Sequence, residues 1–438
     1  MATVSNELIL NADEVIQRAT DRGESDFLIN KKKEALELIE NIDMPKPDKT
    51  NIKRWDFFTM SEPVVDSSVY NSLEELPESV KALLDIENTK NIYVQHNNTP
   101  AYLQIDEKLK DKGVIIENIV EATHNHPELV EKYFMQDGVK VDENKLTAFH
   151  TAMLNGGMFV YVPKDVYIED PVQMVLLHDD EKASIINHVL IVADKGSEIT
   201  YVENYLSNVE ETKEQINIVS EVLALDNAKV TYGGVDVLSE GMTGYINRRG
   251  VASDGARIDW ALGLMNDSNV INDNTTYLMG DRSNSDLKTV TIGRGQQIQN
   301  VTTQIIHYGK DSNGHILKHG VMKDSATSIF NGVGYIKHGG TRADAQQESR
   351  ILMLSDRARG DANPILLIDE DDVTAGHAAS VGRVDPLQLF YLMSRGVSQE
   401  EAERLVIHGF LDPVVAALPI ESVKRQLKEI IEMKILSK

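Results

Sequence analysis

The chain has 438 residues, with 69 acidic against 44 basic side chains and no cysteine. A formal net charge of -25 argues against a nucleic-acid or anionic-membrane binder, because such proteins neutralise phosphates with basic patches. The lack of cysteine excludes disulfides, zinc–cysteine sites and thiol catalysis within the chain. No stretch approaches the roughly 20 apolar residues of a membrane span, and the first residues do not resemble a signal peptide. We therefore expect a cytoplasmic protein that binds neither nucleic acid nor membrane.

The first part of the chain, residues 1–150, is predicted to be a helical and mixed α/β region. Apolar and charged residues alternate at helical spacing through residues 1–45, and prolines then stop the pattern. The aromatic stretch NIKRWDFFTMSEP, residues 51–63, is predicted to be irregular and to pack on the core. The remaining expected elements are helices near 73–86, 112–122 and 127–137, and short strands near 91–105.

His124 and His126 form an H-x-H pair just before Pro127, which is well placed to begin a helix. Alternating histidines can bind a metal ion. At the start of a helix, however, they are more often capping or surface groups. Both interpretations stay open on the sequence alone.

Residues 151–384 are predicted to form a β domain. Short runs rich in Val, Ile, Thr and Tyr, such as SIINHVLIVADKGSEITYVENYL, are separated by Gly, Asn and Asp turns over some two hundred residues. A parallel β-helix, in which each coil covers the next, fits this pattern best. A large sandwich or two stacked sheets is the alternative, because there is no clean sequence repeat.

Residues 385–438 are predicted to be helical. Asp385-Pro386 indicates an N-cap followed by proline, and Gly396 indicates a helix stop. Ser398 with Glu401 three residues later has the spacing of a capping box, so a second helix should begin there and end at Gly409.

Two more helical pieces are expected after Gly409. Asp412-Pro413 should open a short helical turn, and a last helix should follow Pro419. Its apolar residues form one stripe that could cover the end of the β domain or meet a partner: Val423, Leu427, Ile430, Ile431 and Leu436.

The motifs of common enzymes are absent from the sequence. A phosphate loop needs Gly-Lys-Ser/Thr, but Gly309-Lys310 is followed by Asp311, so the chain has no such ATP site. Dinucleotide fingerprints and the nucleophile and zinc motifs of hydrolases are also missing. The acidic run 369–372 could hold a cation, but its spacing is more typical of a solvated turn.

His377 is the leading site candidate, since it lies among small residues in TAGHAASVG. It is either a histidine satisfied by backbone hydrogen bonds or a metal-binding or proton-handling group, because neutral imidazole suits iron. Four further histidines fall in the β region and could gather on neighbouring coils, which the sequence cannot decide: His307, His315, His319 and His338.

The stretch from Gln347 to Leu411 resembles the SufB/SufD family, the scaffold subunits of the SUF iron–sulfur cluster assembly system. The resemblance rests on Gln347, Arg350, LMLSDRARGDANPILLI and DDVTAGHAASVGRVDPLQLFYLMSRGVSQEEAERLVIHGFL. NIKRWDFF resembles the N-terminal Trp-aromatic segment of such proteins more loosely. The resemblance implies a right-handed parallel β-helix flanked by helical segments.

Within this family the chain is similar to the SufD branch, because the resemblance implies that SufB carries the cysteine that receives sulfur. The chain has Ala375 where the branch can carry Cys, and Leu367 where an acid is common. These departures leave His377 as the residue carried over, as a ligand of iron or a nascent cluster at the SufB interface.

The resemblance also implies partners. SufB would pair with this chain near His377, and a SufC ATPase would bind ATP and dock on the C-terminal helices. A homodimer is an alternative when the chain is isolated, and flavin binding stays undecided. The expected docking residues are Leu389, Phe390, Tyr391, Arg395, Gly396, Glu401 and Phe410.

On this interpretation the chain is a non-catalytic subunit, and two other functions compete with a cluster-binding scaffold. One is a purely structural subunit in which His377 only packs. The other is a β-helix enzyme acting on polysaccharide through paired carboxylates, for which Asp254, Asp259, Asp267 and Asp273 are available. Such enzymes are usually secreted, and no signal peptide is visible.

Overall fold

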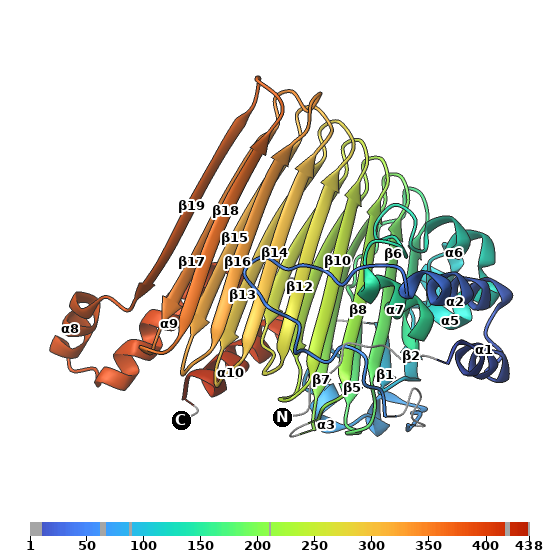
Figure 1. Ribbon diagram of the computed structural model, residues 1–438, viewed down its shortest axis with the longest axis horizontal. Coiled ribbons are helices and arrows are strands. Elements are labelled where there is room, and N and C mark those ends of the chain that lie inside the picture. The colour runs from blue at the N-terminus through green and yellow to red at the C-terminus, as the bar shows by residue number, and fades with distance from the viewer. Residues whose placement is uncertain (1–10, 62–66, 87–89, 210–211, 417–420, 437–438) are drawn as a thin grey trace.

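The computed structural model describes residues 11–61, 67–86, 90–209, 212–416 and 421–436. Its body is a parallel β-solenoid of about eight turns, in which consecutive strands alternate between two sheets (Figure 1). From β4 to β17, each strand pairs in parallel with the strand two positions later in the chain. The β-helix prediction is therefore confirmed over the alternative of a sandwich.

The two sheets differ by one strand. The ten-stranded sheet contains, in spatial order, β19 (Thr374–Arg383), β17 (Asp344–Met353), β15 (Asn313–Met322), β13 (Asn284–Gly293), β11 (Arg257–Leu264), β9 (Lys229–Val237), β7 (Glu198–Ser207), β5 (Val172–His178), β1 (Asn91–His96) and β2 (Thr99–Gln104). The nine-stranded sheet contains β18 (Arg359–Ile368), β16 (Thr327–Ile336), β14 (Ile298–His307), β12 (Asn269–Leu278), β10 (Thr243–Ala252), β8 (Gln215–Ala224), β6 (Ile185–Ala193), β4 (Gly156–Val162) and β3 (Ile115–Asn118).

Alternating side chains decide which face of each strand turns into the solenoid lumen. In β13, Leu287 is buried inside while its neighbours Asp286 and Lys288 form an ion pair outside. The lumen is packed with apolar side chains, and aromatic rings from successive coils contact one another along it in tilted pairs. Tyr232 lies 5.0 Å from Tyr201 and 4.8 Å from Trp260, ring centre to ring centre. A single coil could not bury its apolar side chains alone, and the stacking of coils buries them in one continuous core.

A ladder of tight turns joins the coils along one edge. One residue of each turn adopts a left-handed backbone, with φ between 55° and 64° at Asn227, Gly255, Arg282, Asp311 and Arg342. The amide of each of these residues donates to a carbonyl of the next turn, as Gly255 does to Asp281. Because the requirement is conformational and not chemical, Asn, Gly, Arg and Asp share the position and no sequence repeat is visible.

Helices cover the N-terminal end of the solenoid. They are α1 (Ala12–Asp21), α2 (Asp26–Ile39), the 3-10 turn η1 (Leu73–Glu75), α3 (Glu78–Lys81), α4 (Glu107–Asp111), α5 (Ile119–Asn125), α6 (Pro127–Tyr133) and α7 (Lys145–Met153). The helices expected in 1–45 and the strands expected near 91–105 are confirmed within the described residues.

Two predicted helices of this region are wrong in extent. Residues 112–122 contain β3, which pairs antiparallel with β4 and covers that edge of the nine-stranded sheet. A helix begins only after Asn118, whose side chain accepts the amide of Val120. The predicted helix 127–137 ends at Tyr133, because the chain turns sharply at Met135, where φ is 52°.

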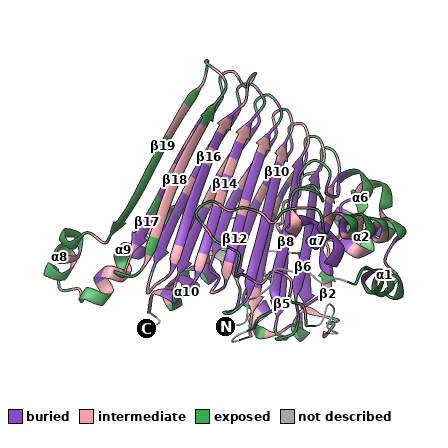
Figure 2. Cartoon of the chain, in the orientation of Figure 1, coloured by how far each residue is buried: buried purple, intermediate pink, exposed green. Residues whose placement is uncertain are grey.

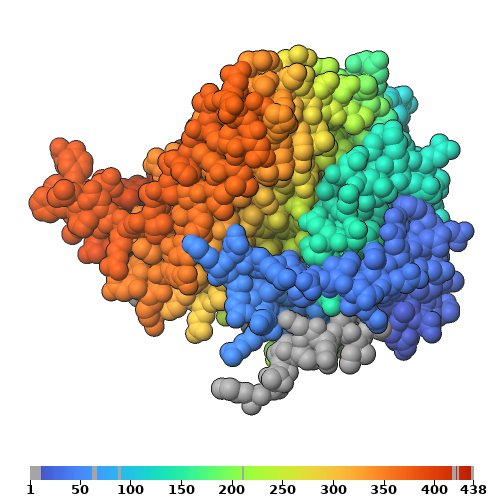
Figure 3. Space-filling model, turned by 45° about the horizontal axis from the view of Figure 1, so that its top comes forward, coloured from blue at the N-terminus to red at the C-terminus, as the bar shows by residue number. Residues whose placement is uncertain are grey.

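Residues 42–59 form a strap that lies across the nine-stranded sheet (Figure 1). In Figure 3 this blue segment reaches from the helical end toward the orange C-terminal coils. Trp55 and Phe57 of the strap are buried against Leu146, Tyr245 and Ile271, as predicted for the aromatic stretch. At the far tip of the strap, Lys49 donates to Asn363 of β18.

Three helices follow the last strand: α8 (Pro386–Ser394), α9 (Gln399–Val415) and α10 (Glu421–Leu436). The predicted caps are confirmed: Asp385 accepts the amide of Leu387, and Ser398 accepts that of Glu401. No helix among the described residues is long and apolar enough to cross a membrane.

The predicted break at Gly409 is wrong, because α9 continues through Pro413 to Val415. Pro413 has no N–H to donate to the carbonyl of Gly409, four residues earlier. Gly409 is exposed, and the space around its Cα is open. Burial of Leu411, Val414 and Val415 against the solenoid favours continuation of the helix.

The apolar stripe of α10 covers the flank of the solenoid and not its end. Leu427, Ile430 and Ile431 pack with buried residues of the ten-stranded sheet, including Val235 and Ala261. The side chains of Val423 and Leu436, and Pro419 itself, lie outside the described residues.

Candidate functional site

The C-terminal end of the solenoid is open. β19 is the last strand of the ten-stranded sheet and β18 the last of the nine-stranded sheet, so within the described part of the chain each has one edge that no strand covers. Figure 2 shows that the residues of β18 and β19 are intermediate or exposed, whereas most residues of the earlier strands are buried. Leu367, Ile368 and Val381 are 43%, 46% and 41% exposed there. Unpaired edges of this length invite pairing with another chain.

The other end of the solenoid is closed. The ten-stranded sheet ends there in the antiparallel strand β2, which carries Pro100. A proline on an edge strand removes a hydrogen-bond donor and discourages further pairing. The nine-stranded sheet ends in β3, and helices pack beside it. Among the described residues, the β18–β19 end is therefore the end of the solenoid at which long strand edges are left uncovered.

His377 lies on β19 at this open end. It is in register with Gln347 of β17, whose side chain points into the lumen. His377 therefore projects from the lumen-facing side of the last strand, and because no coil follows it, the residue is exposed. An accessible imidazole on a rigid strand can coordinate a metal ion as one ligand of a larger set.

The two positions where the chain departs from its family pattern lie close to the same end. Ala375 is two residues before His377 on the same face of β19. Leu367 lies on β18 and is largely exposed. Among the described residues no group of three His, Cys, Asp or Glu side chains could hold a metal ion.

The sequence did not show that two polar side chains, Lys318 and Gln347, lie in the lumen behind His377. Lys318 is fully buried, and its Nζ donates to the carbonyl of Asn331 at 2.7 Å. Burial lowers the pKa of Lys318 well below its ordinary value. The amide of Gln347 donates to the carbonyl of Ile365, while its Oε1 has no hydrogen-bond partner. The sequence does not show whether a lysine in a predicted β strand faces the lumen or the solvent.

The C-terminal helices form a second surface. On α8, the apolar residues Leu387, Phe390 and Tyr391 are 75%, 70% and 58% exposed. Of the other predicted docking residues, Arg395 and Gly396 are exposed, and Leu389 and Glu401 are half-buried. An apolar helix face left uncovered in this way is typical of a partner-binding surface.

Phe410 is placed differently from the other predicted docking residues. It is half-buried, and its ring stacks on His319 of β15 at 4.7 Å. In this chain it therefore attaches α9 to the solenoid.

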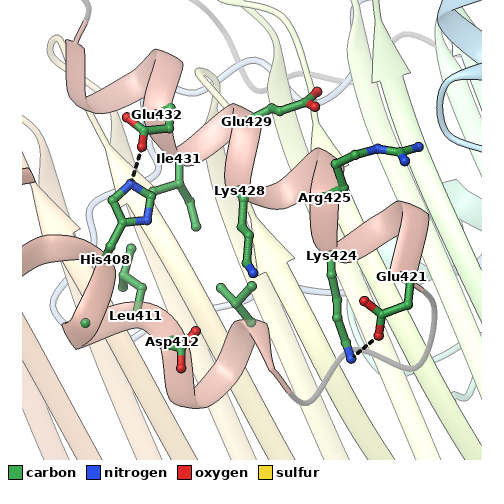
Figure 4. Close-up of a pocket in the computed structure, with 12 residues that line it drawn as sticks. His408, Leu411, Asp412, Glu421, Lys424, Arg425, Lys428, Glu429, Ile431 and Glu432 are labelled. Atoms are coloured by element: carbon green, nitrogen blue, oxygen red, sulfur yellow. Dashed lines mark hydrogen bonds and ion pairs between the residues drawn. The ribbon is translucent and has the colours of Figure 1, made fainter. Parts of the chain in front are cut away.

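A charged cavity of about 760 Å³ lies between α9 and α10 (Figure 4). His408 and Glu432 meet across the two helices, with Nε2 to Oε1 at 2.8 Å. The amine of Lys428 points toward α9, and Lys424 pairs with Glu421. Cationic and anionic groups therefore alternate along this groove, which is suited to contact with a protein surface.

The remaining predicted histidines do not assemble a metal site. His124 contacts the carbonyl of Gly23, and His126 lies 3.5 Å from Glu117. The four histidines of the β region lie apart from one another: His307 is in the lumen beside Ser312, His315 is outside beside Asp286, His319 is under α9, and His338 is at an exposed turn beside Glu370.

The acids considered for polysaccharide chemistry are engaged elsewhere. Asp259, Asp267 and Asp273 pair with Arg257, Arg294 and Arg249, respectively. Asp254 accepts a backbone amide at a turn. Each of these four carboxylates is therefore held by another group of the chain.

Comparison with known proteins agrees with the family pattern. The model of the SufBD core domain of the SUF iron–sulfur cluster assembly system matches residues 176–410. The model of the SufBD N-terminal region matches residues 11–174. An iron–sulfur cluster assembly protein SufD of Bacillus subtilis (strain 168) is 58% identical over 99% of this chain and 100% of its own length.

More distant relatives cover nearly the same span. An iron–sulfur cluster assembly SufBD family protein of Staphylococcus epidermidis (strain ATCC 12228) is 25% identical over 91% of this chain and 87% of its own length. The two family models together cover the helical N-terminal region, the solenoid and the chain up to residue 410, which lies within α9. The chain therefore belongs to the SufB/SufD family of iron–sulfur cluster assembly proteins, within its SufD branch.

Proposed function

We propose that this chain is one of two scaffold subunits that together hold a nascent iron–sulfur cluster, with a SufB-like chain as its partner. The observation that carries the proposal is the open β18–β19 end with His377 on its last strand. Two solenoids joined through such ends would bury the bare strand edges of both. A second copy of this chain could occupy the same end when no partner is present.

His377 would be this chain's ligand to iron or to the cluster, which is the cargo of the assembly. Imidazole binds iron, and a cluster held partly by histidine and partly by groups of another chain can be released more easily than one held by four thiolates. Because this chain has no cysteine, the thiolate ligands must come from the partner.

The C-terminal helices would hold a SufC-like ATPase. The exposed apolar face of α8, with Phe390 and Tyr391 at its centre, is one half of this docking surface. The charged groove between α9 and α10 is the other half. The chain has no phosphate loop, so ATP would be bound by the ATPase and its closure would be transmitted through these helices.

The experiment is to co-express the chain with a SufB-like chain and an ATPase, and to measure iron and sulfide in the purified complex after reconstitution. Substituting His377→Ala should lower cluster content several-fold while the three chains still co-purify. The control is Ser380→Ala, which is exposed on the same strand but faces away from the lumen. Undiminished cluster content with His377→Ala would reduce the chain to a purely structural subunit.

The docking surface is tested separately from the ligand. Phe390→Asp and Tyr391→Ala should release the ATPase from the complex and leave the pairing of the two scaffolds intact. Full retention of the ATPase by both variants would place its docking site elsewhere. If the chain associated with no SufB-like chain, the proposal that it is one of two paired scaffold subunits would be wrong.

A further inference from the structure

A row of four buried polar side chains connects the helical layer to the nine-stranded sheet, far from the open end. His150 comes from α7, His188 from β6, and Asn217 and Glu221 from β8. Each side chain is at most 1% exposed. Nδ1 of His150 lies 3.1 Å from Oδ1 of Asn217, and its Nε2 lies 3.1 Å from Nδ1 of His188. Nε2 of His188 lies 3.1 Å from Oε2 of Glu221.

Hydrogen bonds to the backbone fix the first end of the row. The Asn217 amide nitrogen donates to the carbonyl of Leu146 at 2.9 Å, so its Oδ1 is turned toward His150. An amide oxygen can only accept a hydrogen bond. The Nδ1 atom of His150 must therefore carry a hydrogen.

The second end is fixed by the sharp turn after α6. The two carboxylate oxygens of Glu221 accept the amides of Met135 and Val139 at 2.8 and 2.9 Å. Gly138 is required in this turn, because a Cβ there would come within 2.6 Å of Oε1 of Glu221. The turn is thus built around this one carboxyl group.

The number of protons in the row follows from these two ends. If Nδ1 of His150 donates, its Nε2 accepts in the neutral ring, and Nδ1 of His188 must donate to it. Nε2 of His188 then needs a hydrogen from Oε2 of Glu221. Two neutral histidines and an ionised Glu221 cannot satisfy all three contacts. The contacts are all satisfied only when the row carries one additional proton. A proton transferred from Glu221 to His188 satisfies the same contacts and leaves the count unchanged.

Loss of this proton breaks one contact. The ionised Glu221 takes the hydrogen of His188 on Nε2, and Nδ1 of His188 becomes an acceptor. His150 must then donate from Nε2, which leaves its Nδ1 facing the oxygen of Asn217. Two buried acceptors in contact are unfavourable, so loss of the proton creates a mismatch at the junction of α7 with β8.

Charged groups on the neighbouring elements have opposing effects. Lys32 of α2 disfavours a positive charge on His150. The amides of Val139 and Met135, and then Arg249 of β10, favour ionised Glu221, and Asp137 disfavours it. Burial has the largest effect on each group. It raises the pKa of Glu221 to about 7 and lowers those of His150 and His188, so the proton belongs mainly to the carboxyl group.

We propose that this row is a binding site for a single proton that latches α7 and the turn 134–139 onto the solenoid and releases them as the pH rises past neutrality. The site lies between the N-terminal helical layer and the β-helix, so its occupancy sets how firmly the two parts are joined. It does not depend on His377 or on any partner.

The first test is infrared spectroscopy of the full chain. The wild-type chain should show a protonated-carboxyl band at about pH 6 that fades by about pH 8 with a midpoint near neutrality. Glu221→Gln should lack this titrating band. The control Glu198→Gln, which removes a carboxylate that pairs with Lys229 on the solenoid surface, should keep it. An unchanged titrating band in Glu221→Gln overturns the proposal.

The second test measures the latch itself by hydrogen–deuterium exchange, corrected for the intrinsic effect of pH and compared with α2. Protection of α7 in the wild-type chain should fall about tenfold between about pH 6 and about pH 8, as linkage to one proton requires. Glu221→Gln should be less protected at the lower pH and vary little. An equal pH dependence in both chains contradicts the latch.

A third readout uses only the wild-type chain, in case Glu221→Gln does not fold. Nitrogen-15 NMR should find His150 and His188 as neutral rings protonated on Nδ1 at about pH 6, and protonated on Nε2 once the proton has left. Rings protonated on Nε2 throughout this range would overturn the proposal.

Discussion

The imidazole of His319 lies flat against the ring of Phe410, and its Nδ1 donates to the carbonyl oxygen of the same residue at 2.6 Å. His319 belongs to β15 and Phe410 to α9, so one pair of residues fixes the proposed docking helix to the outside of the solenoid. Motion of α9 under a bound ATPase would therefore reach the β-helix through this contact.

We expect Phe410→Ala to reduce the free energy of unfolding by about 2 kcal/mol, about half the value for a fully buried Phe, because Phe410 is half-buried. Denaturant titration of the full chain measures this. Phe390→Ala is the matched control, since Phe390 is 70% exposed on α8 and its loss should change stability by less than about 0.5 kcal/mol. Equal effects of the two substitutions would mean that Phe410 does not anchor α9.

A buried ion-pair cluster crosses the lumen. Arg248 of β10 donates to Glu203 of β7 and Asp236 of β9 at 2.9 and 2.8 Å, and Tyr201 and Tyr205 donate to Glu203. We expect Arg248→Met to destabilise the chain by about 3–5 kcal/mol, because two buried carboxylates lose their cation. Thermal unfolding checks this.

Two companion variants sharpen this prediction. Arg359→Ala, which removes an exposed arginine paired with Asp361, should change stability by less than about 1 kcal/mol. Adding Glu203→Gln and Asp236→Asn to Arg248→Met should recover part of the loss. If Arg248→Met alone is as stable as the wild type, water enters the lumen and the cluster is not the anchor that its burial indicates.

His307 should make the stability of the chain depend on pH. Its Nδ1 donates to the hydroxyl of Ser312, which donates to the carbonyl of Gly309, while Nε2 has no hydrogen-bond partner among the described residues. Burial lowers the pKa of His307 from 6.5 to about 4. Between these values the unfolded chain binds a proton that the folded chain does not, so this stabilisation is complete above pH 6.5 and is lost as the pH falls toward 4.

The expected loss from His307 over that window is about 3 kcal/mol, from the size of the pKa difference. His307→Gln should flatten the acid side of the stability profile, measured by denaturant titration at a series of pH values. His338→Gln, at a position where the side chain is 89% exposed, is the control and should keep the wild-type profile. A wild-type profile in His307→Gln would show that the lumen admits the charged ring.

Several elements were predictable because their signals are local. The caps at Asp385 and Ser398 act through hydrogen bonds within three residues, so the starts of α8 and α9 could be predicted from the sequence. The β type of residues 156–368 follows from composition and alternation. β3 was missed because four residues among helices adopt a strand only by pairing with β4, which lies some forty residues later.

The candidate site divides in the same way. His377 stands out in the sequence by its small neighbours and its family pattern, but only the register of β19 with β17 places it on the lumen-facing side of an open end. The row from Asn217 to Glu221 gives no signal in the sequence, because its members come from α7, β6 and β8 and meet only in the folded chain.

The sequence by itself determined the β type of the central region, the starts of α8 and α9 and the absence of any cysteine ligand, and it carried the family resemblance. The first three depend on composition or on patterns within a few residues, and the resemblance depends on the longer stretch from Gln347 to Leu411. The tertiary structure alone decided which end of the solenoid is open, which polar residues are enclosed in the lumen, and how one buried carboxyl group connects the helical layer to the sheet. These features arise from contacts between residues tens to hundreds of positions apart, and the physics of burial and hydrogen bonding acts on them only after the coils have stacked.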